Sequence, residues 1–227
     1  FLAEPEHYLR VPLGSEEEAL SLGARPSAEP GCFLMGSRGP GRFRRQDIGS
    51  QAVVPMLDLQ PGQRFLDVCA APGNKTAQAL ESGVRAVACD LHENRLRDLR
   101  VLQCSLVVAD GTQPLPFCGG FDRILVDAPC SGTGTLGRNP DIRWRVQAAD
   151  VVDLHQRQVR ILRNALEQLA PSGRLVYATC SLESEENEGV VNEVLAGAGG
   201  QFRLTGQMQR LPGRDAGDGF YAAVLTS

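Results

Sequence analysis

The chain has 227 residues, of which 42% are hydrophobic and 22% charged, and its formal net charge is -4. This length suits one domain of ordinary size with room for a small appendage, and the composition is that of an ordinary globular chain. The acidic balance argues against binding nucleic acid through overall charge, and no run approaches the roughly 18 apolar residues of a membrane span.

The chain starts at Phe1 without an initiator methionine and without a basic-then-apolar signal pattern, which is compatible with a fragment of a longer protein. Its seven cysteines are widely spaced and include no C-x-x-C pair. This usage argues against a disulfide framework or a zinc site and favours a reducing cytosol. We therefore expect a cytoplasmic monomer that binds neither a metal nor a membrane.

Residues 1–45 differ from the rest and are predicted to form a small N-terminal extension. Tyr8–Val11 suits a short strand, and Ser15–Leu20 suits the capped start of a helix. The Gly/Pro/Arg-rich tract at 36–45 carries four arginines around Phe43, which could follow a phosphate backbone and stack on a base. A flexible linker with solvated charge is the alternative. We expect a domain boundary between residues 45 and 46.

Residues 46–227 alternate between helical and strand patterns, which predicts an α/β fold with a doubly wound, mostly parallel sheet of seven strands. The carboxyl ends of the parallel strands should share one edge, where α/β proteins bind ligands. The expected helices are 47–59, 74–82, 92–103, 148–169 and 183–195, and the expected strands are 63–69, 84–89, 105–109, 121–126, 174–178, 202–204 and 220–225.

The segment from Leu66 to Thr76 combines a strand, a small-residue turn and a helix start, an order typical of a cofactor loop. The G-x-G-x-x-G pattern of dinucleotide sites is absent, which argues against NAD. Asp90 follows about 20 residues after the turn and could accept the ribose hydroxyls of a nucleoside cofactor. Asp110 could read an adenine amino group or serve only its own turn before Gly111.

Two further strands each end in a loop that contains a cysteine, Cys130 after Asp127 and Cys180 before Ser181. We expect Cys180 to precede a helix, whose dipole would favour the thiolate while the nearby glutamates oppose it. A single strand-end cysteine is usually a buried small hydrophobic residue, but two on one edge favour chemistry. A thiolate, a carboxylate and a methyl donor suit methylation at carbon 5 of a pyrimidine flipped out of its stack.

Three segments together resemble the Sun (Fmu/RsmB) family of RNA cytosine-5 methyltransferases. They are L-D-V-C-A-A-P-G-N-K-T from Leu66, D-A-P-C-S-G-T-G from Asp127 and Y-A-T-C-S-L-E-S-E-E-N-E from Tyr177. The similarity runs from about residue 46 to the end. It implies a Rossmann-like methyltransferase fold, S-adenosylmethionine as the cofactor, Cys180 as the nucleophile and Cys130 as the thiol that assists breakdown of the covalent adduct. The residues alone leave the choice between the two thiols open.

The resemblance also implies the cofactor and substrate contacts. Lys75, the only lysine in the chain, would lie near both the cofactor and the target base, and Asp127 would steady the base. Asn74 replaces a glycine common in this family, and we expect it to cap the helix. The residues implied to hold the cofactor are Cys69, Ala70, Ala71, Pro72, Gly73, Asn74, Lys75, Asp90, Asp110 and Asp127.

The loop from Gly137 to Trp144 is similar to the R-x-P-D-I-x-W stretch of the 16S rRNA branch, and its arginines and Trp144 suit contact with RNA. The prediction is therefore an enzyme that methylates carbon 5 of cytosine in 16S rRNA and acts in rRNA processing. Two alternatives stay open, a tRNA substrate for the same chemistry and an assembly factor that binds RNA without turnover. The 227 residues do not include the N-terminal RNA-binding domain typical of the rRNA branch, which leaves the substrate open.

Overall fold

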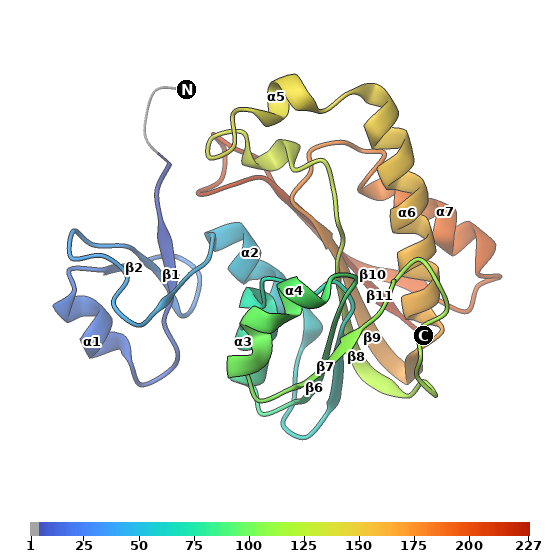
Figure 1. The fold of residues 1–227 in the computed structure, drawn as a ribbon, viewed down its shortest axis with the longest axis horizontal. Helices are drawn as coiled ribbons and strands as arrows, with labels where there is room; N and C mark the ends of the chain where they lie inside the picture. The colour runs from blue at the N-terminus through green and yellow to red at the C-terminus, as the bar shows by residue number, and fades with distance from the viewer. Residues whose placement is uncertain (1–4) are drawn as a thin grey trace.

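The computed structural model describes residues 5–227, so the first four residues of the predicted extension lie outside it. Residues 8–45 form a small four-stranded antiparallel sheet in the order β2-β3-β1-β4, drawn in blue beside the main sheet (Figure 1). One short helix, α1 (Glu16–Ser21), accompanies it. The strands are β1 (Tyr8–Arg10), β2 (Arg25–Pro26), β3 (Cys32–Leu34) and β4 (Arg44–Arg45).

This small sheet changes the interpretation of the arginine-rich tract. Phe43 is buried in the core of the extension, so it does not offer a ring for a base to stack on. Arg42 pairs with Glu18 at 2.8 Å and also binds the Ser15 hydroxyl. The Ser15 side chain therefore does not cap the helix, as was expected, but binds Arg42 instead. β4 ends at Arg45, so the proposed boundary after residue 45 falls in a connecting segment.

The main sheet confirms the predicted α/β architecture. Its seven strands lie in the order β10-β11-β9-β8-β5-β6-β7, with the five from β9 to β7 parallel and the last two of the chain antiparallel. The strands are β5 (Arg64–Asp67), β6 (Arg85–Asp90), β7 (Ser105–Val108), β8 (Phe121–Asp127), β9 (Leu169–Thr179), β10 (Arg203–Arg210) and β11 (Phe220–Thr226).

Helices cover both faces of this sheet (Figure 1). They are α2 (Ile48–Val53), α3 (Asn74–Leu80), α4 (Glu93–Leu96), α5 (Ile142–Arg145), α6 (Ala148–Leu166) and α7 (Glu188–Gly197). Short 3-10 turns extend α2 (Val54–Leu57) and α4 (Arg97–Val101), and a third lies at Thr133–Thr135. Among residues 5–227, no helix is long and apolar enough to cross a membrane.

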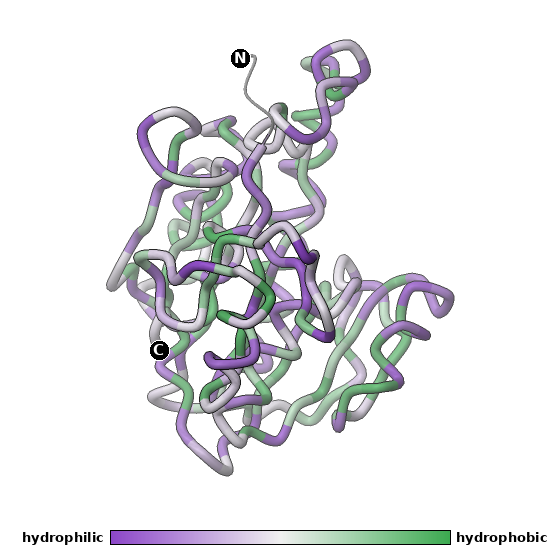
Figure 2. The backbone as a smooth tube through the Cα atoms, turned by 90° about the vertical axis from the view of Figure 1, so that its left-hand side faces the viewer, coloured by the Kyte–Doolittle hydropathy of each residue, from purple (hydrophilic) through white to green (hydrophobic). Residues whose placement is uncertain are grey.

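Alternating side chains on the central strands build two separate cores. In β8, Ile124 and Val126 pack with α6 and α7, whereas Leu125 packs with α2 and α3 on the opposite face. β9 and β11 alternate in the same way, which is the arrangement of a sheet buried on both sides. The outer loops are largely hydrophilic, as Figure 2 shows.

Three predicted helices differ from the structure. The segment expected to be helical over 92–103 contains one α-helical turn followed by a 3-10 turn. The long helix ends at Leu166, and β9 begins at Leu169, within the predicted helix. The helix expected from Glu183 begins only at Glu188, because the preceding residues form turns whose side chains bind the loops beside them.

Arg138 connects distant parts of the chain. Its guanidinium lies 2.6 Å from Asp47, the cap of α2, and 2.8 Å from Asp218, which precedes β11. It also donates to the carbonyl of Glu6 in the extension. The Asp47 and Asp218 side chains are largely buried, so each depends on this one cation for much of its stabilisation.

Replacing Arg138 by alanine should therefore lower the free energy of unfolding by about 2–4 kcal/mol, because two nearly buried carboxylates lose their partner. Chemical denaturation at neutral pH measures this change. Arg143→Ala, on an exposed side chain of the same segment, is the matched control and should change stability by less than about 0.5 kcal/mol. Equal effects of the two substitutions would contradict the connecting role of Arg138.

Candidate functional site

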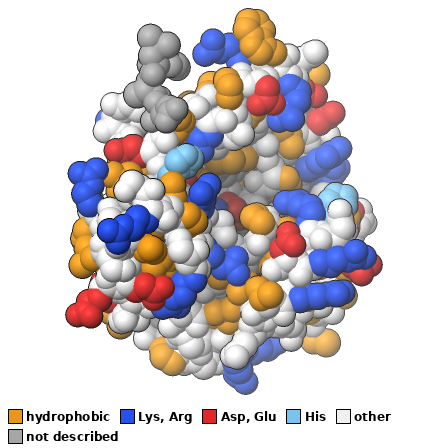
Figure 3. Space-filling view, turned by 60° about the vertical axis from the view of Figure 1, so that its left-hand side comes forward, with side chains coloured by type: hydrophobic (Ala, Val, Ile, Leu, Met, Phe, Trp, Pro, Cys, Tyr) orange, Lys and Arg blue, Asp and Glu red, His pale blue; other side chains and the backbone are white. Residues whose placement is uncertain are grey.

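A cavity of about 720 Å³ opens at the carboxyl edge of the parallel strands. Figure 3 shows a hollowed face with basic side chains gathered around the hollow. The cavity wall includes most of the residues predicted for the site: Cys69, Ala71, Lys75, Asp90, Asp110, Asp127, Cys130 and Cys180. Within the described part of the chain, Ala70, Pro72, Gly73 and Asn74 lie outside this wall.

The turn between β5 and α3 is shaped by close packing. Gly73 has a φ of +97°, and a Cβ atom there would lie 2.7 Å from the Leu99 side chain, so this position requires glycine. Asn74 is the first residue of α3, and Gly73 is the cap. The expected capping role of Asn74 is therefore wrong: its amide donates to the backbone carbonyl of Arg45 at 3.1 Å and so binds the turn to the end of β4.

The two acidic residues after β6 and β7 line the cavity in different ways. Asp90 is buried, and its two oxygens accept from the backbone N–H groups of Ala71 and His92 at 3.3 and 3.0 Å. Asp110 accepts from the backbone and hydroxyl of Thr112 through one oxygen, so it has the turn role that was the alternative, while it also lines the cavity. Both carboxylates have the acceptor chemistry that hydroxyl and amino groups require.

Lys75 and Asp127 form an ion pair in the cavity wall, with Lys75 Nζ 2.7 Å from Asp127 Oδ2. The ammonium also lies 5.4 Å from the centre of the Phe220 ring, within the range of a cation–π contact. Lys75 is almost fully buried at the start of α3, whereas Asp127 is about one-third exposed at the end of β8. The pair thus places one cation and one anion beside the cysteines.

Cys130 and Cys180 bring their sulfur atoms to within 3.4 Å of each other. The hydrogen bond from the Cys130 thiol lowers the pKa of Cys180, with help from the charge of Lys75 and against the effects of burial and Asp127. The pKa of Cys130 is raised well above its usual range by its hydrogen bond with Cys180, by burial and by the negative charges of Cys180 and Glu186. Cys180 is therefore the thiol better able to become a thiolate.

The reason expected for the reactivity of Cys180 was wrong. The following helix begins eight residues later, at Glu188, so its dipole does not act on the thiol directly. The partner thiol and Lys75 replace the dipole as the groups that favour the thiolate. Of the other cysteines, Cys69 lines the cavity, as expected, while Cys32 and Cys89 are buried and Cys118 is exposed.

Several residues of this region were not identified from the sequence. Asp67 lies buried under the turn and accepts from the Thr76 hydroxyl at 2.7 Å, and burial raises its pKa to about 7. Arg157 and Arg160 of α6 also line the cavity. Glu186, read in the sequence as part of an acidic helix start, is completely buried beside the two cysteine loops. A charged residue within an apolar strand, as at Asp67, was the one available signal.

The residues of the loop after β8 have two different roles. Arg138 is bound by Asp47 and Asp218, so it is committed to the fold rather than displayed for a ligand. Trp144 is 83% exposed on α5, and Arg143 and Arg145 beside it are exposed as well. The exposed part of this loop is thus a basic surface with one accessible aromatic ring.

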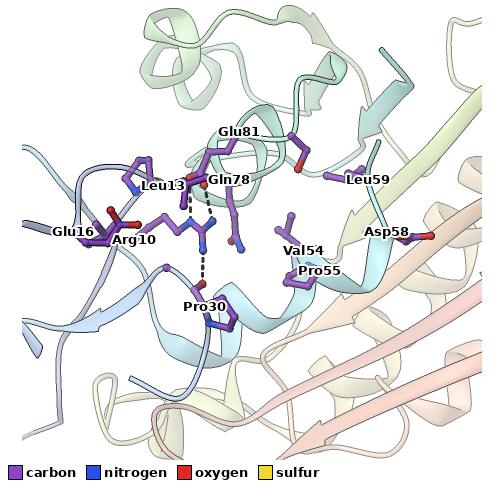
Figure 4. A pocket seen from close by; sticks show the side chains of 14 residues that line it. Arg10, Leu13, Glu16, Pro30, Val54, Pro55, Asp58, Leu59, Gln78 and Glu81 are labelled. Atoms are coloured by element: carbon purple, nitrogen blue, oxygen red, sulfur yellow. Dashed lines mark hydrogen bonds and ion pairs between the residues drawn. The ribbon is translucent and has the colours of Figure 1, made fainter. Parts of the chain in front are cut away.

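A second cavity, of about 670 Å³, lies between the N-terminal sheet and the main domain (Figure 4). Its polar floor is the Arg10 guanidinium, which binds Glu81 at 2.6 Å and the carbonyl of Pro30 at 2.9 Å. Apolar side chains such as Val54, Pro55 and Leu59 line the rest. In this second cavity the charges of Arg10 and Glu81 thus pair with each other. The first cavity, by contrast, contains the two thiols. Within residues 5–227, no cluster of three or more His, Cys, Asp or Glu side chains is arranged to hold a metal.

Comparison with known proteins gives consistent results. The family model described as 16S rRNA methyltransferase RsmB/F matches residues 54–226. The ribosomal RNA small subunit methyltransferase B of Klebsiella pneumoniae (strain 342) is 42% identical over 196 residues, which cover 79% of this chain and 46% of that protein. Its namesake in Yersinia enterocolitica is 40% identical over 197 residues, with the same coverage. The chain spans about half the length of the curated relatives it matches.

Solved structures from Pyrococcus horikoshii have the same fold. A methyltransferase homolog protein superposes with a TM-score of 0.83 at 26% identity, covering 99% of this chain and 87% of the other. NSun6, solved with the ligand SFG, gives a TM-score of 0.73 at 28% identity, covering 82% of this chain and 53% of the other. The first similarity includes the small N-terminal sheet, because it extends over nearly the whole chain.

The charges around Cys180 predict two opposite substitution effects. Lys75→Met removes a cation and should raise the pKa of Cys180, so its alkylation by iodoacetamide should slow by up to about tenfold per unit of pKa. Asp127→Asn removes an anion and should lower that pKa and speed alkylation near neutral pH. Peptide mass spectrometry over a series of pH values measures both rates, and shifts of the same sign would contradict this electrostatic account.

Proposed function

The chain belongs to the 16S rRNA methyltransferase RsmB/F family, and from this premise we propose that it transfers a methyl group from S-adenosylmethionine to carbon 5 of a cytosine in small-subunit rRNA. The observation that carries the proposal is the contact of the two thiols, 3.4 Å apart, in the wall that also contains the cofactor-type turn. One cavity thus combines a nucleophile, a second thiol and acceptor groups for a nucleoside.

The residues in the cavity fit S-adenosylmethionine. Asp90 and Asp110 offer carboxylate oxygens of the kind that bind ribose hydroxyls and an adenine amino group. The turn residues that line the cavity, Cys69, Ala71 and Lys75, would receive the rest of the molecule, with Asp127 in the same wall. The cofactor supplies an electrophilic methyl group bound to a positively charged sulfur.

The catalytic roles follow from the acid–base properties of the side chains. The Cys180 thiolate adds to carbon 6 of cytosine, so that an S–C6 bond forms and the electrons of the C5–C6 double bond move to carbon 5. Asp127 would bind the protonated ring nitrogen 3, with Lys75 holding the carboxylate in place. After transfer of the methyl group, loss of the proton from carbon 5 re-forms the double bond as the S–C6 bond breaks. Cys130 would assist this breakdown.

The surface of α5 is the proposed contact with RNA. Trp144 offers an exposed ring for stacking on an unpaired base, and Arg143 and Arg145 offer charges for phosphates. Arg157 and Arg160 continue the basic character into the cavity itself. A local basic surface can thus bind RNA although the whole chain has a net charge of -4.

RNA from cells that lack the gene can show which RNA is the substrate. Bisulfite sequencing should show the loss of a 5-methylcytosine in small-subunit rRNA, restored by the wild-type gene. Loss confined to tRNA would establish the tRNA alternative instead. Binding of S-adenosylmethionine in calorimetry without methyl transfer to either RNA would favour an assembly factor. A cytoplasmic monomer stays our expectation for the protein.

Cys180→Ala should abolish transfer of labelled methyl groups from S-adenosylmethionine to RNA, because no thiolate then activates carbon 5. Binding of the cofactor, measured by calorimetry, should remain close to that of the wild type. Cys118→Ala is the matched control, because Cys118 is an exposed thiol outside the cavity wall, and this variant should retain transfer. Full activity of Cys180→Ala would refute its assignment as nucleophile.

Cys130→Ala should behave differently and accumulate a covalent RNA–protein adduct, because addition and methyl transfer proceed while breakdown slows. Denaturing gel electrophoresis with labelled RNA detects the adduct as a band of reduced mobility that disappears after nuclease treatment. Loss of activity in Cys130→Ala without any adduct would count against a role in release.

A further inference from the structure

Glu186 lies in the segment between β9 and α7 and is completely buried. One of its oxygens accepts from the Ser131 backbone N–H and from the Gln158 side chain, both at 2.9 Å. The other accepts from the hydroxyl groups of Ser131 and Ser181, the latter at 2.5 Å. Four donors therefore converge on one carboxylate, so each of its oxygens accepts two hydrogen bonds.

The donors come from the two loops that carry the thiols. Ser131 directly follows Cys130, and Ser181 directly follows Cys180. Gln158 of α6 adds a third support, because its amide donates to Glu186 and also to the carbonyl of Pro129, the residue before Cys130. One buried carboxylate thus joins loops that lie 50 residues apart in the chain.

The segment that carries Glu186 is itself firmly held. The Tyr177 hydroxyl donates to the Glu186 carbonyl at 2.7 Å, and the Asn187 side chain binds the Thr179 hydroxyl and the Ser181 carbonyl. These contacts attach Glu186 to the end of β9 and so fix its position relative to Cys180.

We propose that Glu186 is a positioning residue for the reaction, which holds the Cys130 and Cys180 loops together so that their sulfur atoms meet at 3.4 Å. The proposal rests on the proposed function, in which Cys180 attacks the base and Cys130 assists release. The charge of Glu186 also raises the pKa of Cys130, which leaves Cys180 as the more acidic thiol of the pair. The other charged groups that act on the pair are Lys75 and Asp127, while Cys130 itself helps to raise the pKa of the neighbouring Tyr177.

The test uses Glu186→Gln, which keeps the shape of the side chain but replaces one acceptor oxygen by an amide donor. Iodoacetamide labelling followed by peptide mass spectrometry measures the ratio of alkylation at Cys180 to that at Cys130. The ratio should fall by about tenfold or more in Glu186→Gln, and kcat should fall with it while the dissociation constant of S-adenosylmethionine stays unchanged. A purely structural role would lower the melting temperature without moving this ratio.

Glu193→Gln is the matched control, since Glu193 lies on the exposed face of α7 and binds His155 and Arg163 at the surface. It should retain the wild-type ratio. If circular dichroism shows that Glu186→Gln does not fold, Ser181→Ala, which removes one of the four donors, decides the question through the same ratio. A wild-type ratio in the folded variant overturns the proposal. Because alkylation needs no RNA, absence of methyl transfer by the wild type would reject the proposed function without affecting this test.

Discussion

The pairing of β8 with β9 is the constraint on which the site depends. The two strands run parallel in a register that places Asp127 opposite Ala178, and the Ala128 N–H donates to the Ala178 carbonyl at 2.9 Å. The chain leaves both strands at the same edge, so Cys130 and Cys180 meet within three residues of the last pair. A shift of this register would separate the thiols from each other and from Lys75.

Around that contact, the polar groups are arranged in two layers. Lys75 and Asp127 form the layer facing the cavity, where a base and a cofactor would lie. Glu186, Gln158 and the serines that follow each cysteine form the layer behind it, withdrawn from solvent. The front layer sets the charge felt by Cys180, and the rear layer sets where Cys180 stands. Substitutions in the front layer should impair the chemistry by changing the charge around Cys180, and substitutions in the rear layer should impair it by moving Cys180.

The fold was predictable from local patterns, because apolar runs that end in small-residue turns identify parallel strands and their shared edge. The cofactor turn, Asp90 and both cysteine loops followed from that edge. The buried role of Glu186 was not predictable, because the acidic run that contains it is equally typical of a helix start. Only the folded chain shows that four donors surround this one glutamate. Arg138 was expected to contact RNA with the other arginines of its loop, and this was wrong for a similar reason: its partners lie 91 and 80 residues away. The prediction that Phe43 stacks on a base was wrong. A segment this short gives too little hydrophobic pattern to predict burial in a small sheet.

The central claim is that Cys180 attacks cytosine while Cys130 remains a thiol. Its most direct test is an RNA in which fluorine replaces the hydrogen on carbon 5 of the target cytosine, because the fluorine cannot leave as a proton and the adduct is trapped. After incubation with S-adenosylmethionine and proteolysis, mass spectrometry of the cross-linked peptide locates the bond. We expect the nucleotide on Cys180, with Cys130 unmodified. A nucleotide found on Cys130, or no cross-link with an RNA that the enzyme otherwise methylates, would contradict it.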